Sequence, residues 1–255
     1  MRRTVLILAG VVGLAAPLVA GPAAAEDWSV DLGAAGRMRP THLGAPDYTF
    51  DVVPIVEAEY GSRVKVSLDD GLKWAAFRTG PVDAGPIVEY RQSFDDHLPP
   101  GAFRMHDAVE VGGFTSVKTP IGVGEIRLRH AIGSYDGWSG DLSFDTGAPI
   151  TPKLTIAGQA RLSWADSNFT QEYFGLRPHA ARSFGLPRFL DEDYLTAGAE
   201  VDVLRDISPK TRLVLALTGD RIVSELQPSP LFKTRDIFTA SLGVTYHWSP
   251  SGHPK

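Results

Sequence analysis

The sequence predicts an all-β protein, an antiparallel transmembrane β-barrel of about twelve strands, with ten as the alternative count. Three observations lead to this prediction: a leader typical of exported proteins, apolar residues at every second position, and connections that alternate between short and long. Short turns are expected on the periplasmic side of the membrane and long loops on the external side.

The first 25 residues form a predicted signal peptide. Arg2 and Arg3 precede an uncharged, mostly apolar run that ends at Ala20, and an A-x-A pattern ends at Ala25. The apolar run has about 16 residues, fewer than the roughly 20 that a transmembrane helix needs. We therefore expect cleavage near Ala25. The chain then divides into a leader (1–25), a barrel (26–248) and a short tail (249–255).

The composition argues against several classes of function. The chain holds 25 Lys and Arg against 30 Asp and Glu, and this acidic balance argues against nucleic acid as a partner. The lack of cysteine excludes thiol catalysis and indicates that stability comes from backbone pairing rather than from disulfides. The seven histidines are scattered and no P-loop or H-E-x-x-H motif occurs, so we predict no cofactor and no metal site.

Alternation with a period of two recurs along the chain and predicts strands, because successive side chains of a strand point to opposite faces. In EIRLR, residues 125–129, apolar residues alternate with charged ones. KLTIAGQARLSW, residues 153–164, places Leu, Ile and Trp on one face and Lys, Gln and Arg on the other. LTAGAEVDV (195–203) and IFTASLGVTYHW (237–248) repeat the pattern, and no segment shows a convincing helical stripe.

The connections between the predicted strands differ in length with a regular parity. Four of the six odd-numbered connections exceed ten residues and no even-numbered one exceeds six, which is typical of outer-membrane barrels. This parity favours counting 63–78 as two strands rather than one. The predicted strands are 28–37, 50–60, 63–69, 72–78, 82–91, 106–117, 121–132, 137–146, 152–165, 194–204, 211–220 and 235–248.

The polar faces of these strands carry many charges. In a barrel such faces line the lumen, whereas in a soluble sandwich they would be exposed to water. Interleaved acids and bases could pair and fill a narrow lumen, or they could line a small aqueous channel; the sequence leaves both open. The candidate lumen-lining residues are Lys65, Glu89, Arg91, Glu125, Arg127, Arg129, Arg161, Glu200, Asp202 and Arg212.

Aromatic residues collect near the predicted strand ends. Amphipathic rings favour the headgroup level of a membrane, so a barrel that spans it is expected to have two belts. The candidate interface residues are Trp28, Tyr60, Tyr246 and Trp248 on the periplasmic side and Tyr90, Trp138 and Trp164 on the external side.

Acidic segments in two predicted external loops raise the alternative of a hydrolytic site. Asp95, Asp96 and His97 form one segment, and residues 191–193 form the other. Solvation of the barrel rim by charged loops is the simpler interpretation. We therefore predict no catalytic residues.

The stretch WADSNFTQEYFG, residues 164–175, resembles a motif of the MipA/OmpV family of outer-membrane proteins. Further likeness lies in PIVEAEYGSRVKVSLDDGLKW (54–74), GPIVEYR (85–91) and TGDRIVSEL (218–226), so the resemblance extends over about residues 30–248. The chain departs from the family at 183–186, which reads Ser-Phe-Gly-Leu. It also carries a tail after Trp248, where a terminal Phe is usual.

The resemblance implies a non-enzymatic protein of the outer membrane of a Gram-negative bacterium, in contact with outer-membrane lipid. One branch of the family is a scaffold that bridges a lytic transglycosylase and a murein synthase, and another is porin- or adhesin-like. We therefore expect a scaffold for peptidoglycan enzymes, with a small-solute channel or an adhesin-like protein as the alternative.

Overall fold

The computed structural model describes residues 28–93, 98, 101–103, 106–133, 135–185, 190–226 and 230–250. The predicted signal peptide and its cleavage site lie outside these residues, as do Asp95, Asp96 and His97.

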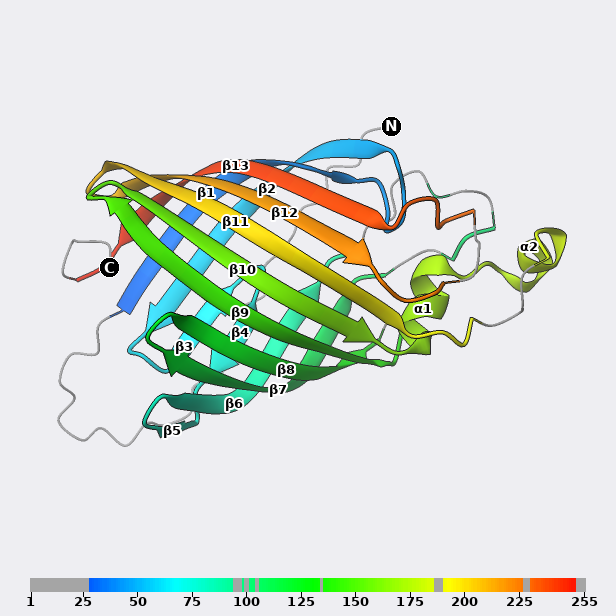
Figure 1. The fold of residues 1–255 in the computed structure, drawn as a ribbon, viewed down its shortest axis with the longest axis horizontal. Coiled ribbons are helices and arrows are strands. Elements are labelled where there is room, and N and C mark those ends of the chain that lie inside the picture. The colour runs from blue at the N-terminus through cyan, green and yellow to red at the C-terminus, as the bar shows by residue number, and fades with distance from the viewer. Residues whose placement is uncertain are drawn as a thin grey trace.

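The described chain forms one closed antiparallel sheet (Figure 1). Each strand pairs with its neighbours in sequence, except that β4 and β5 do not pair with each other; β1 also pairs with β13, and β4 also pairs with β6. In chain order the strands are β1 (Trp28–Pro40), β2 (Tyr48–Tyr60), β3 (Val64–Ser67), β4 (Gly71–Trp74), β5 (Phe77–Thr79), β6 (Val82–Arg91), β7 (Ala108–Thr119), β8 (Gly122–Ile132), β9 (Trp138–Thr151), β10 (Leu154–Ala165), β11 (Tyr194–Ser208), β12 (Thr211–Ile222) and β13 (Asp236–Trp248).

The barrel has twelve strands, because β4 and β5 are two parts of one strand. Both segments pair with β6 and only two residues separate them. Gly85 of β6 lies so close to the Trp74 carbonyl that a Cβ atom would collide with it, and the next residue, Pro86, has no N–H to donate. The predicted count of twelve, an antiparallel barrel with 63–78 divided into two strands, is confirmed.

The largest difference from the predicted boundaries is at β9. A connection was expected at 147–151, but the strand continues to Thr151. Pro149 pairs with Thr155 beside a shift in register between Leu154 and Thr155. Such an irregularity accommodates proline within a sheet, because proline cannot donate a ladder hydrogen bond.

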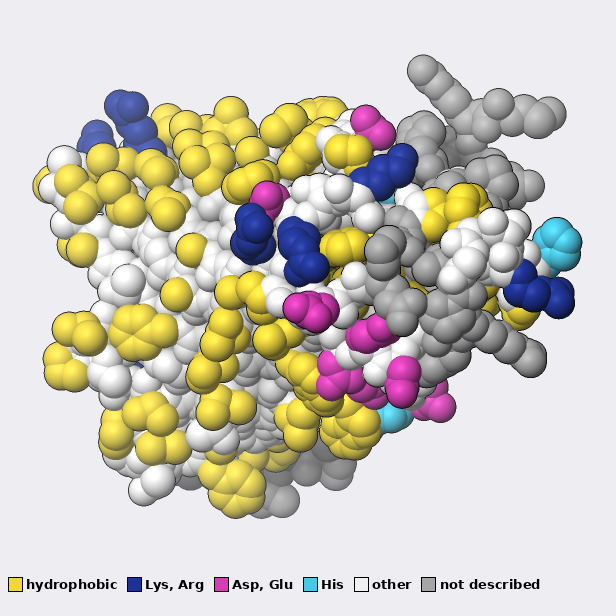
Figure 2. Space-filling model, turned by 45° about the vertical axis from the view of Figure 1, so that its right-hand side comes forward, with side chains coloured by type: hydrophobic (Ala, Val, Ile, Leu, Met, Phe, Trp, Pro, Cys, Tyr) yellow, Lys and Arg dark blue, Asp and Glu magenta, His cyan; other side chains and the backbone are white. Residues whose placement is uncertain are grey.

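Most apolar side chains of the strands point away from the barrel interior, and most charged ones point into it. On β8, Ile126 and Leu128 are 58% and 50% exposed, whereas Arg129 is only 1% exposed. Hydrophobic side chains are accordingly spread over the outer surface of the barrel (Figure 2). This is the orientation that a barrel surrounded by lipid requires.

Two helices lie in the longest connection, at the end of the barrel that we call the external end (Figure 1). They are α1 (Ser167–Phe174) and α2 (Pro178–Ser183), and the sequence prediction contained neither. The side chain of Asp166 accepts hydrogen bonds from the N–H groups of Asn168 and Phe169 and so caps α1. Within the described residues, no helix has the length and apolarity needed to cross a membrane.

The β3–β4 hairpin is much shorter than its neighbours. Each of its strands has four residues, whereas β2 has 13 and β6 has 10. Among the described residues, β3 pairs with β2 only over 57–60, with one further hydrogen bond from Leu68 N–H to the Val56 carbonyl. The hairpin therefore completes the wall only in the half of the barrel opposite the helices (Figure 1).

Closed backbone pairing predicts heat-modifiable migration. In SDS without heating, the protein should migrate as a compact species, because its interstrand hydrogen bonds are mutually protected, and boiling should shift it to the position of the unfolded chain. The measurement is gel electrophoresis of an outer-membrane fraction. Recovery of the protein in a detergent-free periplasmic extract would contradict the barrel in a membrane.

Candidate functional site: a plugged and charged lumen

Glu110 on β7 is the carboxylate with the most partners in the lumen. Its side chain is fully buried and accepts hydrogen bonds from Arg91, from Arg129 Nε (2.8 Å), from Ser139 Oγ (2.9 Å) and from the Tyr135 hydroxyl. These donors come from β6, β8, β9 and the β8–β9 loop, because alternate residues of neighbouring strands share the inner face. Nearly all of the acceptor capacity of one carboxylate is used.

A second group of charges extends from Glu110 across the lumen. Arg129 Nη2 donates to Asp141 Oδ2 at 2.6 Å, and Arg127 Nε lies 3.5 Å from the same oxygen. Arg127 Nη1 also lies 3.0 Å from Asp70 Oδ1 in the β3–β4 turn. The short hairpin is thereby joined to β8 and β9 through the interior of the barrel.

The opposite wall carries two further ion pairs. Asp51 on β2 binds two arginines of β1, with Arg37 Nη2 at 2.8 Å and Arg39 Nε at 2.9 Å. Arg161 on β10 reaches past β11 to Asp220 on β12, where Nη2 and Oδ2 are 2.6 Å apart. Ion pairs thus connect strands on most sides of the lumen.

These side chains surround a chamber of about 350 Å³ near the external end of the lumen. Six arginines and four carboxylates line it, whereas Asp51 and Glu110, which bind four of those arginines, are not part of its surface. The surface available to a ligand is therefore rich in guanidinium groups. The charged lining residues are Arg37, Arg39, Asp69, Glu89, Arg91, Arg127, Arg129, Asp141, Arg161 and Asp220.

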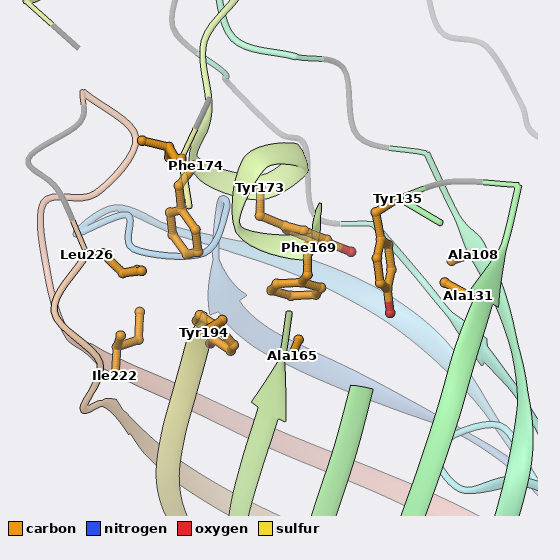
Figure 3. Packing of buried hydrophobic residues seen from close by; sticks show 11 residues of the cluster. Ala108, Ala131, Tyr135, Ala165, Phe169, Tyr173, Phe174, Tyr194, Ile222 and Leu226 are labelled. Atoms are coloured by element: carbon orange, nitrogen blue, oxygen red, sulfur yellow. The ribbon is translucent and has the colours of Figure 1, made fainter. Parts of the chain in front are cut away.

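The external end of the chamber is covered by α1, which we call the plug. Phe169, Tyr173 and Phe174 of α1 are buried against Tyr194 at the start of β11 (Figure 3). The ring of Phe169 stacks on Tyr173 with centroids 4.2 Å apart and meets Tyr135 edge-on at 5.3 Å. These contacts form an aromatic core at the mouth of the barrel.

The plug rests directly on the charges beneath it. The Arg91 guanidinium lies 5.7 Å from the centre of the Phe169 ring, and the Tyr135 hydroxyl donates to Glu110. Burial raises the pKa of Tyr173 to about 12 and also raises the pKa of Tyr135. Both hydroxyls therefore keep their protons near neutral pH, so Tyr135 remains a donor to Glu110.

The predicted lumen residues fall into two groups in the structure. The first group lines the chamber and consists of Glu89, Arg91, Arg127, Arg129 and Arg161. The second group lies outside the chamber lining and consists of Lys65, Glu125, Glu200, Asp202 and Arg212. The shortest ion pairs of this group are Glu125 with Lys73 (2.6 Å), Lys65 with Glu59 (2.8 Å) and Arg212 with Asp206 (2.7 Å). Glu200 accepts a hydrogen bond from the Thr218 hydroxyl (2.8 Å). The structure therefore brings together only half of these residues.

The predicted interface aromatics lie near strand ends. Trp28 and Tyr60 are opposite each other on β1 and β2 and are 43% and 53% exposed. The rings of Tyr246 and Trp248 are 4.4 Å apart. At the external end, Trp138 and Tyr90 are also exposed, and Trp164 Nε1 donates to Asp193 Oδ2 at 2.9 Å. Their placement at the headgroup level stays a prediction.

The acids that hold the arginines are not among the predicted lumen residues; they are Asp51, Glu110, Asp141 and Asp220. Alternation could have found Glu110, because AVEVGGFTS in the predicted strand 106–117 places it on the polar face. Its partners depend on the register between strands, which the sequence does not reveal. Among the described residues, no group of three or more His, Cys, Asp or Glu could hold a metal ion.

A family model described as MltA-interacting protein MipA matches residues 32–248. The chain belongs to this family. Family membership and the closed antiparallel sheet together support an outer-membrane barrel protein. Comparison with curated proteins finds no match.

Three solved structures are distantly similar to this MipA-family barrel. Neisserial surface protein A is 12% identical, with 86% of this chain and 96% of that chain covered and a TM-score of 0.30. A loop-deletion mutant of OmpT, an outer membrane protein of Vibrio cholerae, is 9% identical, with 88% and 99% covered and a TM-score of 0.38. A porin refined at 1.8 Å is 9% identical, with 87% and 100% covered and a TM-score of 0.29. The fold is established by the strand pairing, not by these distant likenesses.

The MipA-family lumen should depend strongly on Glu110. Replacing Glu110 by Ala leaves Arg91 and Arg129 without the carboxylate that they share, and breaking such a buried pair costs about 3–5 kcal/mol of the free energy of unfolding. The measurement is urea unfolding of the barrel in lipid vesicles, followed by tryptophan fluorescence.

The matched control for this substitution is Glu59→Ala. Glu59 pairs with Lys65, and the side chains of Glu59 and Lys65 are 40% and 65% exposed, so its loss should cost only about 0–1 kcal/mol. Equal effects of the two substitutions would show that the Glu110 group does not stabilise the barrel.

Proposed function

We propose that the protein is a non-enzymatic outer-membrane barrel that serves as a scaffold for enzymes of peptidoglycan synthesis and hydrolysis. The family match over residues 32–248 carries the proposal, because the name of that family refers to an interaction with MltA. The partners implied by the sequence resemblance are a lytic transglycosylase and a murein synthase.

The lumen favours a scaffold over a small-solute channel. Ion pairs centred on Glu110 and Asp141 cross the interior, and α1 packs over the chamber with its aromatic face buried. A solute would have to displace these groups in order to pass. The arginines and carboxylates of the lumen thus pair with one another. Of the two arrangements that the sequence leaves open, this favours paired charges that fill the lumen over charges that line an aqueous channel.

The external acids also have an architectural role where the structure describes them. Asp193, in the segment considered for a hydrolytic site, accepts a hydrogen bond from the indole of Trp164. Asp166, at the start of the longest connection, caps α1 and accepts a hydrogen bond from the N–H of Trp138 at 2.7 Å. These uses support a protein without enzymatic activity.

We infer that partner enzymes contact the periplasmic end of the barrel. A groove of about 850 Å³ lies there between the β9–β10 turn and the ends of β11 and β12. Its apolar lining residues are Leu154, Leu213 and Ile207, and Ile207 is 58% exposed. Lys153 and Arg205 also line it and form no ion pair with any residue that the structure describes. An acidic, partly apolar enzyme surface complements this groove.

Affinity purification from crosslinked envelopes tests the scaffold. The tagged protein should recover a lytic transglycosylase and a murein synthase, and Lys153→Glu with Arg205→Glu should lower the recovery several-fold because both substitutions repel an acidic partner. The control is Arg182→Glu in α2, at the opposite end of the barrel. Absence of murein enzymes from the wild-type sample would contradict the proposal.

Planar bilayers distinguish the scaffold from the channel. Because ion pairs and the plug obstruct the lumen, the wild-type protein should give no stable single-channel steps. Regular steps that change when Arg127, Arg129 or Arg161 is neutralised would instead establish the small-solute channel.

A further inference from the structure

We propose that the barrel wall has a lateral opening between β2 and β6, and that the chamber behind it binds the head group of an anionic amphiphile. The hydrocarbon tail of this molecule would lie in the external half of the membrane. The proposal goes beyond the scaffold function and is independent of it.

The pairing of the strands leaves part of the wall incomplete. From Tyr48 to Ile55, β2 pairs only with β1 among the described residues, because the β3–β4 hairpin ends at the level of Val56. On the other side, β4 pairs with β6 only at Ile87 and Val88. The last three residues of β6, 89–91, pair only with β7 within the described chain.

The direction of the backbone confirms that the free edge of β2 faces this gap. The Val56 carbonyl accepts a hydrogen bond from Leu68, so the polar groups of Val56 and of every second residue before it point toward β3 and not β1. Pro54 is one of these residues, and proline in a sheet is confined to edges because it has no N–H to donate. The backbone groups of Phe50 and Val52 point in the same direction.

The gap is wide enough for a hydrocarbon chain. At the level of the hairpin, β2 and β6 are separated by β3 and β4, which makes three interstrand spacings or about 14 Å. Unpaired backbone groups in lipid cost several kcal/mol each, so an edge of this kind is tolerated where it borders a cavity or a ligand rather than open lipid.

The chamber lies directly behind the gap. Its lining includes Glu89 and Arg91 from β6 on one side and Asp69 from the hairpin turn below. Beyond β2, Arg37 lines it from β1, and Arg37 Nη2 lies 3.4 Å from Gln92 Oε1 just after β6. One side-chain contact therefore spans the inner face of the gap.

The chamber presents donors suited to an anion. Arg37 and Arg39 both bind Asp51, Arg91 and Arg129 both bind Glu110, and Arg129 also binds Asp141. Arg129 is 1% exposed, and its Nη1 atom has no hydrogen-bond acceptor among the described residues. A phosphate or carboxylate head group matches such guanidinium donors in geometry as well as in charge.

The outer margin of the gap is apolar. Val52 is 70% exposed and Phe50, whose ring lies over Gly36 of β1, is 68% exposed; both values are among the highest for large apolar side chains of the barrel. Tyr90, on the β6 side of the gap, is 52% exposed, and its hydroxyl donates to Asp107. An apolar outer margin in front of a guanidinium-rich chamber fits a molecule with a hydrocarbon tail and an anionic head.

The test uses the full mature protein in phosphatidylcholine nanodiscs and dodecyl phosphate with a photoreactive group in its tail. Crosslinks should concentrate on residues 48–56 and 87–91, and an uncharged dodecanol probe should label them far less. Arg37→Gln with Arg39→Gln should weaken dodecyl phosphate binding by about 30-fold, as expected for the loss of two cations near an anionic lipid. The control Arg212→Gln, whose side chain pairs with Asp206 outside the chamber lining, should leave binding unchanged.

A second pair of variants avoids any effect on the charged lumen. The chain has no cysteine, so Val52→Cys can be modified with a bulky maleimide, which should block crosslinking, whereas modified Leu217→Cys on β12 should not. Labelling spread evenly around the barrel, or equal labelling by the uncharged probe, would overturn the proposal. Disulfide-linked dimers of the unmodified Val52→Cys variant in the bilayer would also overturn it, because a second copy would then cover the edge.

Discussion

Every strand of this protein is subject to the requirement that backbone polar groups in lipid be paired within the protein. The sheet meets the requirement by joining β1 to β13 and β4 to β6, so that most strands have two antiparallel neighbours. Closure in turn fixes the alternation, with one face of each strand turned to lipid and the other to the lumen. The positions of the charged side chains follow from this single constraint.

Because one face of the sheet is apolar toward lipid, the interior of the barrel holds mainly charges, together with a small buried cluster of Ala75, Ile87 and Phe114. Glu110, Asp141 and the arginines around them neutralise one another at close range. A larger cluster of buried apolar side chains lies at the external mouth, where Phe169, Tyr173 and Phe174 pack on Tyr194. The Arg91 contact with Phe169 joins these two environments, so the plug and the charged lumen stabilise each other.

Most of the fold could be predicted from the sequence because strand alternation is local. The run 153–164 shows its two faces without any knowledge of its neighbours, and the parity of the connections decides between a barrel and a sandwich. Helix α1 was missed because its eight residues are too few to show a helical stripe in a polar, aromatic segment. The ion pairs were missed for another reason: Arg161 finds Asp220 two strands away, and only the register and curvature of the sheet bring them together.

The pairing of β1 with β13 has a consequence for the order of assembly. His247 Nδ1 lies 3.1 Å from Asp31 although the two residues are 216 positions apart in the chain. The contact that closes the wall is therefore among the most distant in sequence, and loop-closure entropy makes such contacts slow to form. Until β13 arrives, β1 has an unpaired edge that could join a foreign strand. A chain of this topology benefits from being held open and protected until its last strand is available.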